Sequence, residues 1–316
     1  MSHAKPSIPQ PPHPHLRRDP LPWQTPKPVE DDIDAPQRIQ EILNNPSYRE
    51  ADTDIEFLNT DATRGVRLQI DYAKPELLLN RHGIKHTIVV FGSTRIVEPA
   101  AARRAVEESK QRLVAEPDNP ELQMRLRRAE RVLAKSHYYD EAREFGRIAG
   151  HAGAREEEGL VVLTGGGPGI MEAANRGAYD VGAETVGLNI SLPHEQYPNP
   201  YLTPDLCFQF HYFALRKLHF LLRARALVAF PGGFGTFDEL FETLTLIQTR
   251  KIKPVPVVLV GEEYWRKAFD VKFLVDEGVI DPEDRELFWF AETAEEIWQG
   301  IVHWHEVNGE PLISKA

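Results

Sequence analysis

Short runs of apolar and β-branched residues, most of them ending in glycine or another small residue, alternate with helix-period segments from His86 onward. The apolar runs are TIVVFG (87–92), LVVLTGGG (160–167), ETVGLNIS (184–191), ARALVAFPGG (224–233), VPVVLVG (255–261) and the weaker FWFA (288–291). The helical segments are 169–181, 212–223, 236–250, 262–275 and 293–306. Runs that are apolar on both faces are typical of buried parallel strands. The pattern predicts an α/β fold, with a doubly wound, mostly parallel, Rossmann-like sheet and helices on both faces.

The pattern divides the chain into three parts. Residues 1–35 are rich in proline, which removes backbone donors and favours an extended tail. This tail is either a plain surface segment or a ligand for a proline-binding domain. Residues 36–84 are predicted to form a helical extension that packs on the main domain. Residues 85–310 are predicted to form the Rossmann-like, nucleotide-binding domain.

One segment is too long for a minimal strand–helix unit. Residues 99–150 are helical in pattern and highly charged, and the turn sequence EPDNP (116–120) interrupts them. Apolar stripes before and after that turn predict an inserted helical hairpin. The stripes are Ala102, Val106 and Leu113, then Leu122, Leu126, Ala129 and Leu133. The hairpin is either an oligomerisation arm or a solvated decoration whose stripes pack only on each other.

The composition of the chain mainly argues against certain classes of protein. The 316 residues carry a formal net charge of −11, which argues against nucleic-acid binding, because affinity for the phosphate backbone comes from Lys and Arg. The sequence has no run of about 18 apolar residues, so we expect no membrane-spanning helix. Cys207 is the only cysteine, and no secretion signal is recognisable, so we expect a cytoplasmic protein.

Three glycine-containing loops follow apolar runs, and a doubly wound sheet brings such loops to its carboxyl edge, where ligands bind. The loops contain Gly92 and Ser93, then Gly165, Gly166 and Gly167 within TGGGPGIME (164–172), then Gly232, Gly233 and Gly235 within PGGFGTFDE (231–239). Consecutive glycines let backbone N–H groups approach an anion, and the helix N-terminus that follows adds a positive dipole end. The loops therefore predict a phosphate or nucleotide site. For the second loop, a tight strand-to-helix turn is the alternative.

The third loop combines donors with carboxylates. Its glycines can form a nest of amide groups, and Thr236 can donate its hydroxyl to a phosphate oxygen. Thr236 and Glu239 also match a capping box, which is a purely structural explanation. Asp238, Glu239 and Glu242 crowd the same helix start and repel an anion. We therefore expect at least one of these carboxylates to serve another part of the ligand.

These loops resemble the motifs of the LONELY GUY (LOG) family, whose members are often labelled lysine-decarboxylase-like. PGGFGTFDE resembles the PGGxGTxxE signature of the family, and further segments resemble its other motifs: GST (92–94), TGGGPGIME (164–172), LNISLP (188–193) and FALRK (213–217). The resemblance covers residues 85–310 and points to the longer members. It implies a phosphoribohydrolase, an N-glycosidase that cleaves a nucleoside 5′-monophosphate into free base and ribose 5-phosphate.

The resemblance also implies roles for single residues. It makes Glu239 and Arg216 catalytic, and it adds Lys217 to the nucleotide-binding residues of the glycine loops. Phe213 and Ala214 depart from the Met-His of the small members, which favours AMP or another purine or pyrimidine monophosphate over cytokinin nucleotides. Cleavage passes through an oxocarbenium-like sugar, so it needs negative charge near the anomeric carbon and a positioned water. We predict that Glu239 stabilises this cation and deprotonates the water.

Two other function classes remain open. The protein could be a Rossmann-type nucleotide or cofactor carrier that binds without cleaving, or a scaffold built around the hairpin and the tail. The sequence has no His, Cys or Asp cluster with metal-ligand spacing, so we expect neither a metal nor a cofactor. The expected partners are the small-molecule nucleotide and, by analogy with related enzymes, further copies of the chain in a homo-oligomer.

Overall fold

Seven parallel strands form one sheet in the order β4-β3-β2-β1-β5-β6-β7 in the computed structural model, which describes residues 11, 13–17, 19–154, 159–193 and 197–312. The strands are β1 His86–Phe91, β2 Leu160–Thr164, β3 Thr185–Ile190, β4 Cys207–Phe210, β5 Ala224–Ala229, β6 Val257–Val260 and β7 Trp289–Ala291. From β1 the chain first adds strands on one side and then returns to add β5 to β7 on the other. The predicted doubly wound, Rossmann-like sheet is therefore confirmed.

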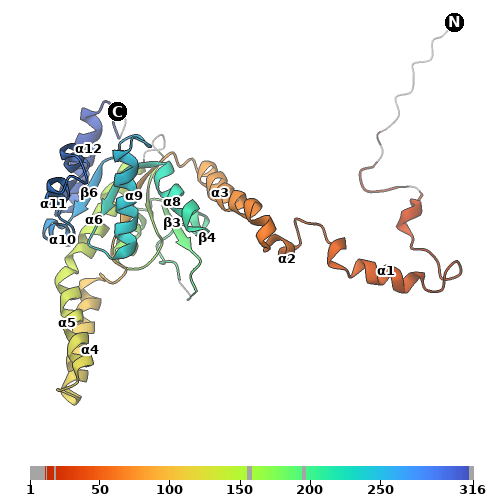
Figure 1. The fold of residues 1–316 in the computed structure, drawn as a ribbon, viewed down its shortest axis with the longest axis horizontal. Helices are drawn as coiled ribbons and strands as arrows, with labels where there is room; N and C mark the ends of the chain where they lie inside the picture. Colours follow the sequence, from red (N-terminus) through yellow and green to blue (C-terminus); the bar gives the residue numbers. More distant parts are fainter. Residues whose placement is uncertain (1–10, 12, 18, 155–158, 194–196, 313–316) are drawn as a thin grey trace, which may run out of the picture. The chain divides into compact units, whose positions relative to one another are not determined.

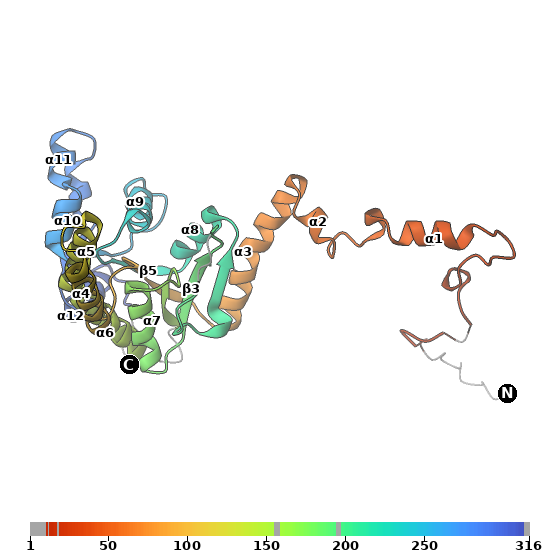
Figure 2. The ribbon, with the colours of Figure 1, turned by 90° about the horizontal axis from the view of Figure 1, so that it is seen from below.

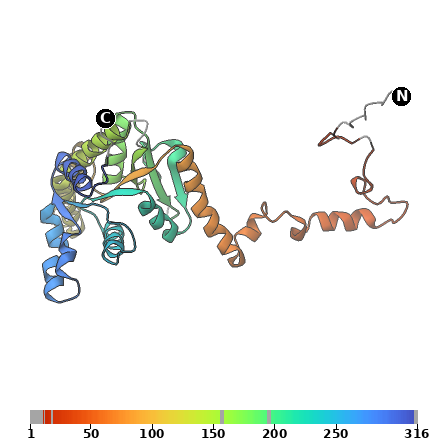
Figure 3. The same ribbon diagram turned by 90° about the horizontal axis from the view of Figure 1, so that it is seen from above.

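Helices cover both faces of this sheet (Figure 2, Figure 3). One face carries α6 His137–Gly153, α7 Ile170–Asp180 and α12 Ala294–Val307, and the other carries α8 Phe213–Leu222, α9 Phe234–Gln248, α10 Glu262–Ala268 and the end of α3 Arg64–Arg81. The alternation along β1 explains the two layers. Ile88 and Val90 belong to the first core, whereas Val89 and Phe91 belong to the second. Every strand of the centre is thus buried on both sides, as its apolar run predicted.

Two local features differ from the apolar and helical patterns. No apolar run in the sequence predicts β4. This strand lies at the edge of the sheet and exposes Gln209, so its pattern is not continuously apolar. The segment 262–275 is not one helix. It divides into α10 and α11 Val271–Asp276, because the carboxylate of Asp270 accepts a hydrogen bond from the N–H of Phe273 at 3.1 Å and so starts a new helix.

The inserted hairpin is shorter than the 99–150 predicted. The helices α4 Pro99–Ala115 and α5 Pro120–Lys135 lie side by side and form it (Figure 1). Residues 137–153 form α6, which packs on α7 and the sheet and buries Tyr139, Ala142 and Phe145 completely. The charges of α6 lie on its other face, and for this reason the charged pattern extended the prediction too far. The helix α6 is part of the Rossmann-like layer.

The chain separates into two compact units, Met1–Arg67 and Leu68–Ala316. The first unit contains α1 Ala35–Leu43 and α2 Ile55–Leu58, and Asp54 caps α2 by accepting from the N–H of Phe57 at 3.1 Å. The second unit contains the sheet and both of its helical layers. Short 3₁₀ turns are Pro22–Gln24, Pro46–Tyr48, Asp61–Thr63, Pro204–Leu206 and Pro282–Glu286. Within the described residues, every helix is too short or too polar to cross a membrane.

Candidate functional site

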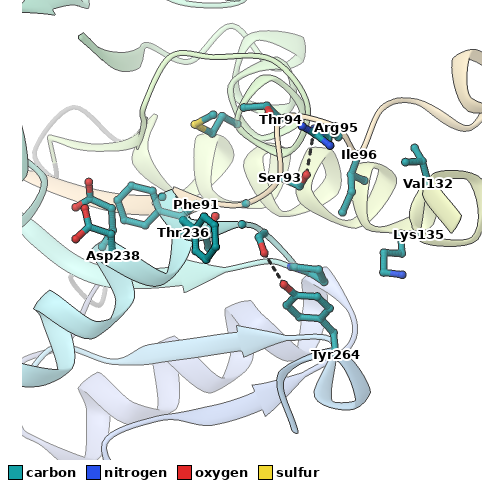
Figure 4. Close-up of a pocket in the computed structure, with 18 of the residues that line it drawn as sticks. Phe91, Ser93, Thr94, Arg95, Ile96, Val132, Lys135, Thr236, Asp238 and Tyr264 are labelled. Carbon is teal, nitrogen blue, oxygen red and sulfur yellow. Dashed lines mark hydrogen bonds between the residues drawn. The ribbon is translucent and has the colours of Figure 1, made fainter. Parts of the chain in front are cut away.

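The strand order reverses between β1 and β5, and the loops that follow these two strands meet at the carboxyl edge of the sheet. The N–H of Ser93 donates to the carbonyl of Pro231 at 3.0 Å, and the N–H of Phe230 donates to the carbonyl of Phe91 at 2.9 Å. A cavity of about 620 Å³ opens beside them (Figure 4). Doubly wound sheets bind their ligands at this switch point. Its lining includes eight of the predicted site residues: Gly92, Ser93, Arg216, Gly232, Gly233, Gly235, Thr236 and Glu239.

The N-terminus of α9 opens into this cavity. Gly233 is the N-cap, so the N–H groups of Phe234, Gly235 and Thr236 have no acceptor within the helix. A Cβ atom on Gly232 would lie 2.0 Å from Oγ1 of Thr236, so only glycine lets the loop turn this closely around that hydroxyl. The hydroxyl of Tyr264 donates to the carbonyl of Gly232 and holds the loop from its other side. The arrangement is a rigid set of donors suited to an anion.

The capping box that Thr236 and Glu239 suggested is not formed. A capping box needs its Thr at the N-cap, and that position belongs to Gly233, which has no side chain to donate or accept. Thr236 is the third residue of α9 instead, and Glu239 lies in the second turn. The glycine-rich start makes the helix begin earlier than the capping pattern indicated, which leaves both side chains available to the cavity.

Glu239 is a buried carboxyl group at the cavity wall. It is 8% exposed, and burial raises its pKa to about 7, because the charged form loses its hydration. The positive charges of Lys217 and Arg216 oppose this effect, and the carboxylates of Glu242 and Asp238 add to it. A carboxyl group with a pKa near neutrality can accept and donate a proton at physiological pH.

Arg216 projects from α8 toward the same wall. Its Nε donates to the carbonyl of Leu188, within β3, at 2.7 Å, and its guanidinium lies over the ring of Phe220. Burial lowers the pKa of Arg216, and the charge of Glu239 raises it. The charges of Arg216 and Glu239 therefore shift each other's pKa. No hydrogen bond joins the two side chains within the described residues.

Lys217 does not line the cavity. Its Nζ lies 2.7 Å from Oδ1 of Asp238 and 3.2 Å from Oε2 of Glu242, so it ties α8 to α9. Of the three carboxylates at the start of α9, Asp238 and Glu242 are thus engaged with Lys217, whereas Glu239 has no ion pair within the described residues. The positive charge of Lys217 lowers the pKa of the nearby Glu239. The predicted contact between Lys217 and a nucleotide stays a prediction.

The second glycine loop lies behind the cavity. Gly165, Gly166 and Gly167 are buried and are not part of its lining. A Cβ atom on Gly165 would lie 2.7 Å from Nη2 of Arg216, so this glycine leaves space for the guanidinium. The carbonyls of Gly166 and Gly167 accept hydrogen bonds from the backbone and side-chain amides of Asn199, at 2.9 and 3.1 Å. The predicted ligand role of these glycines also stays a prediction.

The cavity has a wall that the sequence analysis did not assign to it. Arg128, Arg131, Val132 and Lys135 of α5 line one side, together with Arg95 from the loop after β1. Their spacing on α5 does place them on one helical face. Nothing local in the sequence says that this face turns toward the glycine loops. Met171, Phe213 and Tyr264 also line the cavity, and of these three only Tyr264 lies outside the motifs quoted from the sequence.

No cluster of three or more His, Cys, Asp or Glu side chains suited to a metal ion occurs within the described residues. The donors that face the cavity are amide groups, hydroxyls, guanidinium groups and one ammonium group, and its carboxylates are Asp238 and Glu239. This set of groups is suited to an anion with a polar, uncharged part.

The comparisons with known proteins find one family model and several curated relatives. Residues 171–301 match the family model described as possible lysine decarboxylase. A probable cytokinin riboside 5′-monophosphate phosphoribohydrolase of Oryza sativa subsp. japonica is 28% identical over 145 residues, which cover 43% of this chain and 65% of the relative. A cytokinin riboside 5′-monophosphate phosphoribohydrolase of Arabidopsis thaliana is 30% identical over 141 residues, which cover 43% of this chain and 64% of the relative. The alignments span less than two thirds of these curated relatives.

Solved structures with a similar chain path include molybdenum-cofactor proteins. The Moco carrier protein of Chlamydomonas reinhardtii is 19% identical, with a TM-score of 0.41, over 71% of this chain and 99% of that chain. The molybdenum cofactor binding protein of Rippkaea orientalis is 19% identical, with a TM-score of 0.39, over 69% of this chain and 95% of that chain.

Proposed function

Because residues 171–301 are related to the LOG, or lysine-decarboxylase-like, family, we propose that this protein is a nucleoside 5′-monophosphate phosphoribohydrolase. It hydrolyses the N-glycosidic bond of AMP or another purine or pyrimidine monophosphate, cytokinin nucleotides included, and releases the free base and ribose 5-phosphate. One observation carries the proposal: the buried carboxyl of Glu239 shares a helix with the free amide groups of Phe234, Gly235 and Thr236.

The amide groups fix the 5′ end of the substrate. In the proposed complex, a phosphate accepts hydrogen bonds from these amides, from the hydroxyl of Thr236 and from the hydroxyl of Ser93, which also line the cavity. The helix dipole of α9 favours the negative charge there. Glu239 lies one turn further along α9, so the ribose of a bound nucleotide extends toward its carboxylate.

Glu239 then acts on the sugar and on water. As the C1′–N bond breaks, its electron pair leaves with the base, and the positive charge that develops on the ribose is stabilised by the carboxylate. A water oxygen bonds to C1′ and one of its protons passes to Glu239, while the departing nitrogen takes up a proton from the solvent, so that the base leaves neutral. General base help accounts for about 10²–10⁴-fold of the rate. Since enzymes commonly supply about 10⁶-fold or more, positioning by the loop and by Arg216 must provide the remainder.

Arg216 is placed to act on the leaving side of the reaction. Its guanidinium is fixed by the carbonyl of Leu188 and by the ring of Phe220, and it keeps Nη donors for a hydroxyl of the ribose or for the departing base. We assign it the positioning of the substrate and the stabilisation of charge.

The test is release of base by the purified full chain, without added metal, from AMP, GMP, IMP, CMP and UMP, with adenosine as the phosphate-free control. We expect base from one or more monophosphates and none from adenosine. Glu239→Gln lowers turnover by about 10²-fold or more and retains nucleotide binding. The matched control is Glu277→Gln, an exposed carboxylate outside the cavity, which keeps full activity.

Two outcomes overturn the proposal. If nucleotides bind but no base appears from any of them, the protein is a carrier. If Glu239→Gln keeps full turnover, the catalytic assignment of Glu239 is wrong even though the reaction takes place.

We also propose that the protein is a cytoplasmic homo-oligomer. The support is an aromatic surface beside the cavity, where Phe234 is 96% exposed and Phe241 is 39% exposed, since large exposed aromatic side chains are enriched at subunit contacts. Light scattering coupled to size exclusion tests the oligomer, and a monomer at micromolar concentration would contradict it.

A further inference from the structure

The helix α5 presents a row of cations to the cavity. Arg128, Arg131 and Lys135 follow each other at intervals of three and four residues, so they share one face. That face lines the cavity, whereas the apolar stripe of α5 packs on α4. Arg95, from the loop after β1, adds a fourth cation beside them. We call these four residues the cationic wall.

The cationic wall is not neutralised by the protein. Across the part of the chain that the structure describes, no carboxylate lies within 4.0 Å of any of the four side chains. Other cations of this acidic chain are paired, such as Lys217 with Asp238. Lys267 lowers the pKa of Glu263 most, through a hydrogen bond and its charge, and Lys135 adds to this effect without forming an ion pair with Glu263. Four uncompensated cations at one cavity favour an anion of more than one charge.

The position of the wall decides which part of a nucleotide it meets. In Figure 4, Asp238 and Lys135 lie at opposite ends of the cavity, with Thr236 between them. Glu239 lies one helical turn beyond Thr236 along α9, so we take the end of the cavity away from Lys135 as the sugar end, and the amides of α9 mark the first phosphate. The cationic wall therefore lies beyond the first phosphate, on the side away from the ribose.

The length of the wall excludes a single phosphate as its partner. Arg128 and Lys135 are seven residues apart on α5, a separation of about 10 Å along the helix axis. One phosphate already held by the α9 amides cannot contact both. A chain of two or three phosphates, continuing from the α9 amides, can reach along this face and accept hydrogen bonds from several of its side chains.

We propose that the cationic wall binds the second and third phosphates of the ligand, so that the preferred substrates carry a 5′-pyrophosphate group rather than a single phosphate. This inference rests on the proposed cleavage of the N-glycosidic bond and changes its preferred substrate class from the monophosphates to nucleotides with a longer phosphate chain. The group is present in nucleoside diphosphates and triphosphates and also in sugar-linked compounds such as ADP-ribose. The reaction at C1′ is unchanged, and the phosphate chain only strengthens binding at the opposite end.

The experiment compares AMP, ADP, ATP and ADP-ribose as substrates, with the base replaced by whichever base the monophosphate assay identifies. Divalent metal is omitted so that the phosphates stay free. We expect kcat/KM for ADP to exceed that for AMP by about 10-fold or more, mainly through a lower KM, because the added contacts are charge-assisted. The ADP-ribose arm separates a preference for a free terminal phosphate from a preference for any pyrophosphate.

A double variant tests the residues themselves. Arg131→Gln combined with Lys135→Gln should lower the ratio of kcat/KM for ADP to that for AMP by about 10-fold. Arg127→Gln, on the same helix but absent from the cavity lining, should leave the ratio unchanged. Arg131 is exposed and Lys135 is half-buried, without a described ion pair, so the double variant should keep the melting temperature of the parent.

The outcomes separate this inference from the proposed function. Base release from AMP at least as efficient as from ADP, or an unchanged ratio in the double variant, overturns the pyrophosphate preference and leaves the phosphoribohydrolase proposal standing. No base from any nucleotide, with ADP binding more tightly than AMP in calorimetry and losing this advantage in the double variant, overturns the proposed function and keeps the cationic wall.

Discussion

Glu239 carries two consequences of burial, and the first concerns the rate. Its pKa is raised to about 7 by loss of hydration, and only its deprotonated form accepts a proton from water. We predict that kcat falls as the pH drops through about 7. The positive charge of Lys217 lowers the pKa of Glu239, so Lys217→Gln should move the midpoint of the kcat profile to higher pH. Initial rates between pH 5 and 9 check both, and a profile without an inflection between pH 6 and 8 would contradict the prediction.

The second consequence concerns stability. Between pH 4.5 and about 7 the folded chain binds more protons at Glu239 than the unfolded chain does, so burial of Glu239 costs stability as the pH rises through this window. The full cost is at most about 3 kcal/mol. Glu239→Gln removes the charge, so this variant should be more stable than the parent at pH 8 and equal to it near pH 4.5. Denaturant unfolding at both pH values provides the test; a variant less stable at pH 8 would refute it.

A substitution at Gly165 distinguishes two roles for the second glycine loop, which are making space for Arg216 and binding the phosphate directly. Its Cβ, if present, would lie 2.7 Å from Nη2 of Arg216 and 3.0 Å from Sδ of Met171, which are both the far ends of flexible side chains. Gly165→Ala should therefore fold normally but displace Arg216 and lower kcat by about 10-fold or more. If the loop instead binds the phosphate directly, as predicted from its sequence, the same change raises KM and leaves kcat alone. Steady-state kinetics and a thermal melt distinguish these results.

At the scale of elements, α6 and α7 are in direct contact through their glycines. A Cβ on Gly177 would lie 1.8 Å from the carbonyl oxygen of Arg143, and one on Gly146 would lie 2.1 Å from that of Ala174. These are rigid backbone atoms. Gly177→Ala should therefore destabilise the fold by about 3 kcal/mol or more through overpacking.

The control is Gly65→Ala in α3, where nothing lies within 4 Å of the new Cβ and a helical Ala is favoured by up to about 1 kcal/mol. Chemical denaturation measures both variants. Equal stability of Gly177→Ala and the parent would mean that α6 is not packed into the sheet layer. It would then belong to the inserted hairpin, as predicted from the sequence for residues 99–150.

The strands and helices differ in how well the sequence predicts them. Strands buried on both faces leave an unbroken apolar run, so the central sheet could be predicted, whereas β4 with its exposed Gln209 could not. The helix α6 was assigned to the insertion because Arg143, Glu144 and Arg147 dominate its pattern, while the buried face is made partly of small residues such as Ala142. Small residues carry little hydrophobic signal, although they are what lets two helices approach closely.

The sequence predicts only those site residues that lie close together along the chain or in a family motif. The third glycine loop and Glu239 belong to one continuous segment, and Arg216 was added by the family motif. Three residues of the cationic wall, Arg128, Arg131 and Lys135, come from an insertion more than 90 residues earlier in the chain, and their direction depends on how the hairpin leaves the sheet. No pattern within α5 specifies that direction, so the sequence predicts only an oligomerisation arm or a solvated decoration for the hairpin.

At the scale of the molecule, the second compact unit begins within α3 rather than at the first strand. Asp71 accepts hydrogen bonds from the N–H groups of His211, at 3.2 Å, and Tyr212, at 3.0 Å, just before α8. Glu76 pairs with Arg223 through Nη2 and Oε2 at 3.0 Å. Leu79 is 1% exposed within the second core. These contacts join the end of the predicted 36–84 extension to the Rossmann-like domain.

Truncation turns this into a prediction. A chain that begins at residue 64 keeps α3 whole, so it should melt at the same temperature as the sheet unit of the full chain. A chain that begins at residue 85 loses the burial of Leu79 and leaves Arg223 without its carboxylate. Each of these losses costs about 2–5 kcal/mol, which together approach the whole stability of an average domain. Calorimetry of the three chains should therefore show a lower melting temperature, or no cooperative transition, only for the shortest. Equal melting of all three would restore residue 85 as the start of the folding unit and reduce α3 to an appendage.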